Sequence, residues 1–251
     1  MIRIGCAGWS LPRAAQDRFP EGEGSLARYA AVFDCAEINS SFHRLHRAST
    51  YERWAASVPP GFLFSVKLAK AITHGARLVK CTRLLDEFLA PVHSLGEAFG
   101  CLLVQLPPKL ELHTAVAKRF FKAAEARGVP GMALEPRHAS WFTPAADALL
   151  QRHGIARVAA DPPRAPGGDE PGGWRGFAYY RLHGSPRMYY SAYGSGFLDA
   201  LAQRISSHPS PAWCVFDNTA GNAAVPNALD LRQRLETAAR ASIIMAPPRP
   251  R

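Results

Sequence analysis

Short apolar runs rich in β-branched and aromatic residues recur along the chain and predict strands. The run GFAYYRLHG, from Gly176 to Gly184, is typical of them because Gly bounds it on both sides. We predict eight strands, at Ile2–Trp9, Cys35–Phe42, Phe62–Ala69, Cys101–Pro107, Gly131–Arg137, Ala156–Asp161, Phe177–His183 and Ala212–Asn218.

Segments with helical spacing of apolar residues separate most of these strands. Thr143 followed by Pro144 predicts a helix start, and Gly128 and Gly154 lie where two helices should end. One connection differs, because Pro162 to Gly176 (PPRAPGGDEPGGWRG) is too rich in Pro and Gly to hold a helix. We predict a helix-free, mobile loop between strands six and seven.

Eight strands alternating with helices predict an α/β fold, an irregular TIM-type (β/α)8 barrel. The 251 residues with 47% hydrophobic content suffice for one large core, so we predict a single domain over residues 1–251. The tail at residues 246–251 is expected to be disordered.

Polar residues concentrate late in the predicted strands. Residues i and i+2 of a strand share a face, so Arg181 and His183 point one way while Tyr180 and Leu182 point the other. Active sites of (β/α)8 barrels lie at the C-terminal ends of the strands. We therefore expect one pocket there, formed by Trp9, Glu37, Asn39, Lys67, Gln105, Glu135, Arg137, Asp161, Arg181, His183, Asp217 and Asn218.

The formal net charge of +10 favours an anionic partner. Only six of the 30 basic residues are lysines, and no run of basic residues concentrates the charge. Nucleic-acid binding usually shows as a localised basic patch, so it is the less favoured interpretation.

Five cysteines without a CxxC pair imply neither a disulfide framework nor a zinc site. The N-terminal MIRIGCAGW lacks the pattern of a secretory signal, and no apolar segment reaches the roughly 18 residues that span a bilayer. The expected location is the cytoplasm, with no membrane partner.

Eight segments in chain order carry a resemblance to a known family. They are GCAGW, EINSSFHRL, FSVKLAKAITH, LLVQLPPKL, EPRHASWF, AADPPR, YYRLHGSPRMYYSAYG and VFDNTAGNAAVPNALDL, between Gly5 and Leu231. The chain resembles the family called domain of unknown function 72, or YecE-like. The resemblance implies a TIM-barrel-like fold and no particular reaction.

Carboxylates in a barrel mouth are candidates for general acids or bases, because partial burial raises their pKa toward the working pH. Glu37, Glu135 and Asp161 are the predicted catalytic carboxylates. The alternative is salt bridging with the basic residues of the same pocket, which would keep the carboxylates ionised and inert.

Lys67, Arg137 and Arg181 suit an anionic ligand, because guanidinium and ammonium groups match phosphate and carboxylate oxygens. Lys67 could instead form a Schiff base with a carbonyl substrate, although acidic neighbours would keep it protonated. His183 is the first choice for moving protons, and His138 and His74 are weaker candidates. The alternative for His183 is a structural bond to a carboxylate.

Asp217, Asn39, Gln105 and Asn218 are predicted to orient the ligand or to satisfy backbone groups at strand ends. The acidic residues and His183 are ligand types that divalent metals use, so a divalent metal is possible; because the interleaved basic residues already neutralise the carboxylates and no metal-binding motif occurs, no cofactor is predicted. Aromatic residues would line the rim, with SPRMYYSAYG as a flexible lid: Trp9, Phe42, Trp141, Trp174, Tyr189, Tyr190 and Tyr193.

Together these features predict an enzyme that performs acid–base chemistry, as a hydrolase, lyase or isomerase, on a small anionic metabolite such as a sugar phosphate. The alternative is a non-catalytic protein that binds an anion or nucleic acid. Barrel folds are mostly enzymes, but that association is an analogy and not evidence about this site.

Overall fold

Strands from the whole length of the chain form one sheet of ten strands, in the order β7-β9-β10-β1-β2-β3-β4-β5-β6-β8. The computed structural model describes residues 1–244, so the tail predicted to be disordered lies outside the described residues. The strands are β1 (Ile2–Ala7), β2 (Cys35–Ile38), β3 (Leu63–Lys67), β4 (Phe99–Gln105), β5 (Met132–Glu135), β6 (Ile155–Arg157), β7 (Ala159–Asp161), β8 (Gly172–Gly173), β9 (Ala178–Leu182) and β10 (Ala212–Phe216).

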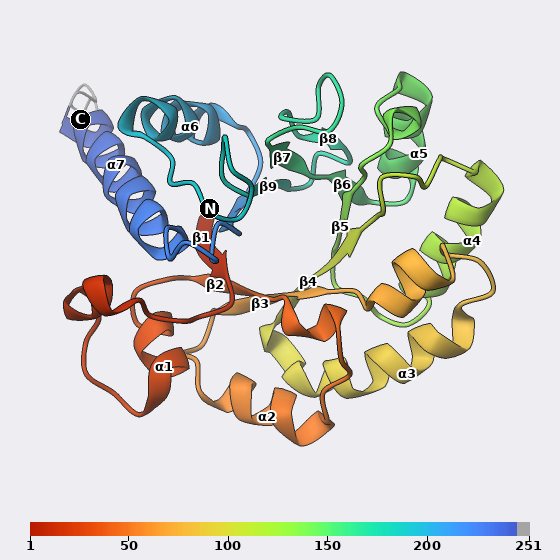
Figure 1. Ribbon diagram of the computed structural model, residues 1–251, viewed down its shortest axis with the longest axis horizontal. Helices are drawn as coiled ribbons and strands as arrows, with labels where there is room; N and C mark the ends of the chain where they lie inside the picture. Colours follow the sequence, from red (N-terminus) through yellow and green to blue (C-terminus); the bar gives the residue numbers. More distant parts are fainter. Residues whose placement is uncertain (245–251) are drawn as a thin grey trace, which may run out of the picture.

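The sheet curls until its two ends nearly meet (Figure 1). Only Val158 separates β6 from β7; β6 pairs with β5, whereas β7 pairs with β9. The segment predicted as strand six therefore joins the two sides of the sheet. The result is a nearly closed, mixed, barrel-like sheet in an α/β fold.

A strict (β/α)8 barrel differs from this sheet in three respects. The sixth strand is divided, the short β8 runs antiparallel to β6, and no helix lies between β7 and β9 in the described chain. The predicted helix-free connection is thus confirmed. Arg157 anchors it by donating to the carbonyl oxygen of Gly167 at 3.0 Å.

Helices surround the sheet on its outer side (Figure 1). They are α1 (Gly24–Ala30), α2 (Ala48–Ala56), α3 (Thr82–Val92), α4 (Thr114–Glu125), α5 (Pro144–Arg152), α6 (Ser195–Ser207) and α7 (Ala224–Ile244). Short helical turns are η1 (Arg13–Arg18), η2 (Ser40–Phe42), η3 (Ala71–Gly75), η4 (His93–Ala98) and η5 (Ala139–Trp141). The predicted start of α5 is confirmed, because the Thr143 hydroxyl accepts a hydrogen bond from the Ala146 amide at 3.2 Å.

Alternation along the strands divides the buried side chains into two apolar layers. The smaller layer fills the inside of the sheet with Cys35, Cys101, Leu103, Ala133, Val158, Tyr179, Trp213 and Val215. The larger layer lies between the sheet and the helices and includes Tyr180 and Leu182. Because Tyr179 faces inward while its neighbours face outward, the predicted alternation of β9 is confirmed.

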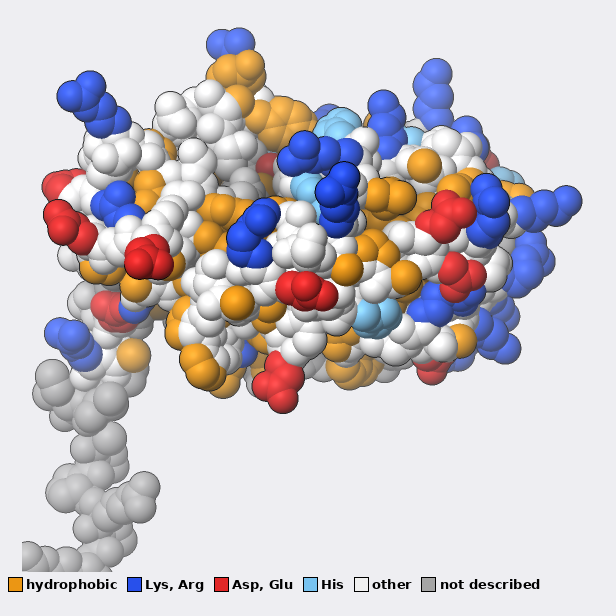
Figure 2. Space-filling model, turned by 90° about the horizontal axis from the view of Figure 1, so that it is seen from below, with side chains coloured by type: hydrophobic (Ala, Val, Ile, Leu, Met, Phe, Trp, Pro, Cys, Tyr) orange, Lys and Arg blue, Asp and Glu red, His pale blue; other side chains and the backbone are white. Residues whose placement is uncertain are grey.

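On the face formed by α1, α2 and α3, basic side chains lie at many scattered positions with acidic side chains between them (Figure 2). Within the described residues, no helix combines the length and apolar character needed to cross a membrane.

Candidate functional site

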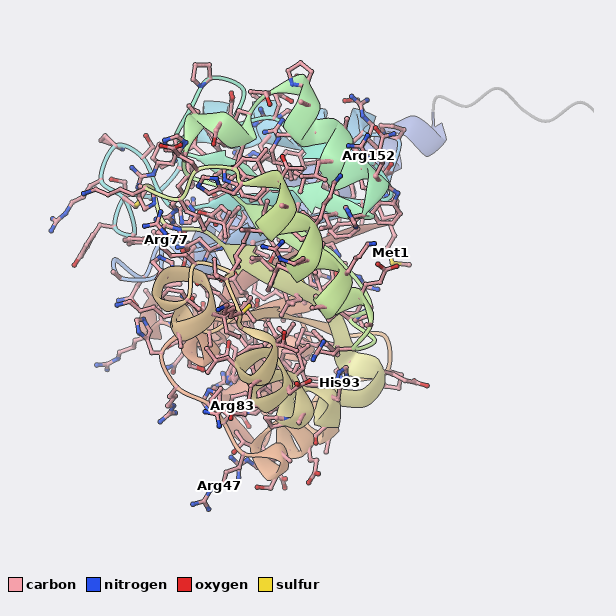
Figure 3. All side chains as sticks on the ribbon, turned by 90° about the vertical axis from the view of Figure 1, so that its right-hand side faces the viewer. Met1, Arg47, Arg77, Arg83, His93 and Arg152 are labelled. Atoms are coloured by element: carbon pink, nitrogen blue, oxygen red, sulfur yellow. The ribbon has the colours of Figure 1, made fainter. Side chains whose placement is uncertain are left out.

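The C-terminal ends of the strands meet at one end of the sheet. Figure 3 shows this end from the side, with Arg77, just beyond η3, at one end of the molecule and Met1 at the other. A cavity of about 520 Å³ opens there. Its lining residues are Asn39, Phe42, His43, Lys67, Lys70, His74, Gln105, Tyr189, Tyr190, Asp217, Thr219 and Ala220.

Arg181 is fully buried beneath this cavity and binds three carboxylates. Its Nε and Nη2 atoms donate to Glu37 Oε2 and Oε1 at 2.9 and 2.6 Å. Its Nη1 donates to Glu135 Oε2 at 2.9 Å, and Nη2 lies 2.9 Å from Asp217 Oδ2. Burial alone would lower the pKa of Arg181, but Asp217, Glu37 and Glu135 raise it well above its ordinary value. This guanidinium is a permanent internal cation.

His183 lies between two of the same carboxylates. Its Nδ1 is 2.9 Å from Asp217 Oδ2, and its Nε2 is 3.3 Å from Glu135 Oε1. Only the imidazolium form can donate from both nitrogens at once. Burial would lower the pKa of His183, but the Glu135 carboxylate and the hydrogen bonds outweigh burial and raise it. The geometry and the raised pKa both favour the imidazolium form of His183 in this cluster.

The cluster is balanced in charge. Arg137 completes it, with Nε donating to Glu135 Oε1 at 3.0 Å. Burial would raise the pKa of Glu135 and of Asp217, but the neighbouring cations, Arg181 first, lower both. We call these six residues the Arg181 cluster: the carboxylates Glu37, Glu135 and Asp217 and the cations Arg137, Arg181 and His183.

This arrangement matches the salt-bridging alternative for Glu37 and Glu135. It also changes the role expected of Arg181, because all of its donor groups face protein acceptors and its side chain has 0% exposure. A guanidinium so enclosed organises the interior and does not reach a ligand in the cavity. Of the cluster, Asp217 is the member that lines the cavity.

Lys67 is not part of the charge-balanced Arg181 cluster. It ends β3 with 7% of its surface exposed and lines the cavity. Among the described residues, no carboxylate oxygen lies within 4.0 Å of Nζ, which sits 4.3 Å from the centre of the Phe42 ring. Burial, followed by repulsion from Arg181, lowers the pKa of Lys67 to about 8. No carboxylate pairs directly with Lys67 in the described chain, but the expected acidic neighbours are present: Glu37, Glu135 and Asp217 raise its pKa from a greater distance, by less than burial and Arg181 together lower it.

The rim of the cavity adds Lys70, which is exposed, and the imidazoles of His43 and His74. Burial, with the charges of Arg137, Lys67 and Lys70, lowers the pKa of His74, so its ring is neutral at neutral pH. Lys67 and Lys70 place two basic side chains along this part of the cavity wall. A second cavity of about 530 Å³ adjoins this rim and shares Phe42, His43, Lys70 and His74 with it.

Sequence reasoning missed Lys70 and His43, and gave His74 little weight. The signal was present in FSVKLAKAITH for Lys70 and His74 and in EINSSFHRL for His43, because the loop that follows a strand at the C-terminal end of a barrel-like sheet supplies pocket residues. Asn39 and Gln105 lie at the cavity as predicted, and Gln105 Oε1 also accepts from Arg181 Nη1 at 3.3 Å.

Trp9 is not brought to the cavity. The strand β1 ends at Ala7, and Gly8 takes a φ of 91°, which breaks the alternation that had placed Trp9 inside. The indole packs edge-on against Trp54 and Phe64, at centroid distances of 5.1 and 5.9 Å. Its position is that of a packing residue in the outer apolar layer.

Asp161 and Asn218 also lie away from the cavity lining. Asp161 has the same parity as the outward-facing Ala159, and its Oδ1 accepts from the Tyr193 hydroxyl at 2.8 Å. Asn218 follows the inward-facing Asp217 and so faces outward, where Nδ2 donates to the Ser191 carbonyl oxygen at 3.0 Å. Asn218 thereby ties the 184–193 loop to the sheet.

The predicted aromatic rim is formed in part. Tyr189 and Tyr190, from the segment predicted as a lid, line the cavity together with Phe42. Trp141 instead is buried and donates to the Leu110 carbonyl oxygen at 2.9 Å, and Trp174 packs on Phe177. His138 binds Ser140 in η5.

In the part of the chain that the structure describes, no three His, Cys, Asp or Glu side chains are grouped as metal ligands. Three of the candidate acidic ligands, Glu37, Glu135 and Asp217, face Arg181 or His183 instead, and Asp161 accepts from the Tyr193 hydroxyl.

Comparison with known proteins places this geometry in a family. Residues 3–251 match the family described as "Protein of unknown function DUF72". UPF0759 protein YecE of Escherichia coli strain K12 is 29% identical over 169 residues, which are 64% of this chain and 59% of YecE. UPF0759 protein YunF of Bacillus subtilis strain 168 is 27% identical over 152 residues, 57% of this chain and 53% of YunF. The aligned chain thus spans less than two thirds of the length of either relative.

Solved structures of two DUF72 family proteins share the fold. The protein from Enterococcus faecalis V583 gives a TM-score of 0.78 at 18% identity, covering 94% of this chain and 96% of that one. The protein from Thermotoga maritima MSB8 gives 0.73 at 22% identity, covering 94% and 99%. With its family model matched from residue 3 onward and its fold shared with these structures, the chain belongs to the DUF72 family.

Proposed function

We propose that this protein is an enzyme that performs acid–base chemistry on a small anionic metabolite bound in the cavity at the C-terminal ends of the strands. One observation carries the proposal: Lys67 is a nearly buried cation that faces the cavity without an adjacent carboxylate, next to an internal cluster whose own charges are balanced. An anionic ligand would supply the missing negative charge.

Residues at the bottom (floor) of the cavity and residues at its rim have different proposed roles. Lys67 on the floor and Lys70 on the rim attract the anion, and the neutral His74 ring is the base available at the cavity wall. Asp217 lines the cavity while its Oδ2 holds His183, so this pair can pass a proton between the cavity and the interior. The likeness to a TIM-type barrel, with its sites at this end of the sheet, supports an enzyme by analogy.

Thermal unfolding in the presence of inorganic phosphate and small carboxylates tests anion binding. A ligand at 100 times its Kd stabilises the native state by about 2.7 kcal/mol, which is a rise of roughly 5–11 °C for a chain of this length. We expect the rise to be lost in Lys67→Met and reduced in Lys70→Ala. Lys118→Ala on α4, which removes an exposed lysine outside the cavity, should keep it. An unchanged rise in Lys67→Met would contradict the proposed site.

Asp217→Asn separates catalysis from simple binding. If the protein is an enzyme, this variant loses turnover and still binds the anion; a binding protein has no turnover to lose. A nucleic-acid binder would instead lose affinity steeply as salt is added.

A further inference from the structure

We propose that Lys67 is a nucleophile that forms an imine with an anionic aldehyde or ketone in this cavity. The inference deepens the proposed function and rests on it, because the same cavity must first bind the anionic part of the substrate. It names a substrate class, a small carbonyl compound that also carries a carboxylate or phosphate group.

Position is the first argument. An amine nucleophile must be within reach of a ligand and free of a salt bridge, and Lys67 meets both conditions. Arg181 and His183, which lie deeper, are engaged with carboxylates. Lys70 is exposed on the rim, where it can hold the anionic group while the carbonyl reaches the floor.

The surroundings of Lys67 favour the reactive form of the amine. With the pKa of Lys67 at about 8, the amine is unprotonated in about one tenth of the molecules at pH 7, compared with roughly one in 2,500 for an ordinary lysine. The product keeps the charge in place, because the iminium nitrogen is also a cation and would lie over the face of Phe42 as the ammonium does.

The reaction balances without any further reagent. The Nζ lone pair attacks the carbonyl carbon, a C–N bond forms, and the oxygen takes up a proton to give a carbinolamine. The C–O bond then breaks and water leaves, so one ammonium and one carbonyl become one iminium and one water. His74 and Asp217, both at the cavity wall, are placed to accept and return the protons.

Reductive trapping tests this step. The full chain is incubated at pH 7 with pyruvate or with pyridoxal 5′-phosphate and sodium cyanoborohydride, which reduces an imine to a stable amine. Peptide mass spectrometry then compares the six lysines of the chain: Lys67, Lys70, Lys80, Lys109, Lys118 and Lys122. We expect the adduct on Lys67 at least about tenfold above every other lysine, and a matching loss when phosphate competes for the cavity.

Lys67→Arg and Lys70→Arg are the matched variants. The first should abolish the adduct, and the second, which keeps the positive charge on the rim, should leave the adduct on Lys67. If Lys67→Arg does not fold, the ratio among the lysines of the unaltered chain still decides.

Uniform labelling of all six lysines, or labelling of the others without Lys67, would overturn the imine proposal. Stabilisation by phosphate without an adduct on Lys67 would overturn it too, and would leave the proposed anion site standing. Absence of both stabilisation and adduct would overturn the inference together with the proposed function.

Discussion

Replacing Arg181 by Met removes the central cation of the Arg181 cluster and should be strongly destabilising. Glu135 keeps Arg137 and His183 as partners, and Asp217 keeps His183. Glu37 loses its bidentate ion pair, and the Tyr179 hydroxyl at 3.2 Å is the one side-chain hydrogen-bond donor left to it among the described residues, in a site with no exposure.

Breaking a buried ion pair by removing one partner costs about 3–5 kcal/mol, because the other charge stays buried and uncompensated. With a urea m-value of about 3 kcal/mol/M, a loss of about 4 kcal/mol lowers the midpoint of unfolding by about 1.3 M. Urea titration at pH 7, followed by circular dichroism, measures this shift directly. Adding Glu37→Gln to Arg181→Met should recover part of the loss, since it neutralises the stranded carboxylate.

Arg127→Met provides a control of the same size. Arg127 Nε lies 2.6 Å from Asp86 Oδ1 in a pair at the protein surface, so its removal should shift the midpoint far less. A midpoint for Arg181→Met within about 0.3 M of the unaltered protein, or equal to that of Arg127→Met, would refute the view that this cluster is a dry, mutually dependent set of charges.

Three further predictions concern the titration of His183, the hydrogen bonds of Tyr29 and the burial of the cysteines. His183 should titrate above pH 6.5 in an NMR titration of its imidazole resonances, because its pKa is raised in the folded protein. Its contribution to stability is therefore complete below pH 6.5 and is lost as the pH rises through the folded pKa. Titration of His183 at or below pH 6.5 would contradict this. Tyr29→Phe should lower the free energy of unfolding by about 1–3 kcal/mol, because the Tyr29 hydroxyl accepts from the Cys6 amide at 2.7 Å and donates to the Cys35 carbonyl oxygen at 3.0 Å. A change below about 0.5 kcal/mol in a urea titration would argue against a stabilising role for these two hydrogen bonds. All five cysteines are buried, so Ellman's reagent should react with none in the native protein and with all five in guanidinium chloride; rapid reaction of a native thiol would contradict that burial.

Much of the fold could be predicted, because period-2 alternation is dictated by strand geometry. It placed Glu37, Lys67, Gln105, Arg181 and Asp217 on the inside of the sheet, and the structure has them there. The same rule, applied strictly, would have excluded Asn218, which immediately follows Asp217 and therefore faces outward.

The rest depends on features that local pattern does not encode. The predicted strand from Ala156 to Asp161 breaks at Val158, where the chain leaves β5 and joins β9, and such a change of partner is set by how the sheet closes. The positive φ of Gly8 ended β1 before Trp9. The pairing of Arg181 with carboxylates, in place of a ligand, depends on how the closed sheet turns the inward faces of β2, β5 and β9 and the end of β10 toward one another, which involves residues far apart in sequence.

The large sequence separation between Arg181 and Glu37 also affects the order in which the fold can form during synthesis. Its partner Glu37 precedes it by 144 residues, so at roughly 5–20 residues per second the ribosome delivers the guanidinium about 7–29 s after the carboxylate. Until then the inward-facing Glu37 lacks the guanidinium that pairs with it in the native structure, and burying its charge without that partner is costly. The buried ion pair between Glu37 and Arg181 therefore forms only after β9 has been synthesised, and the closed sheet of the native structure cannot be completed earlier.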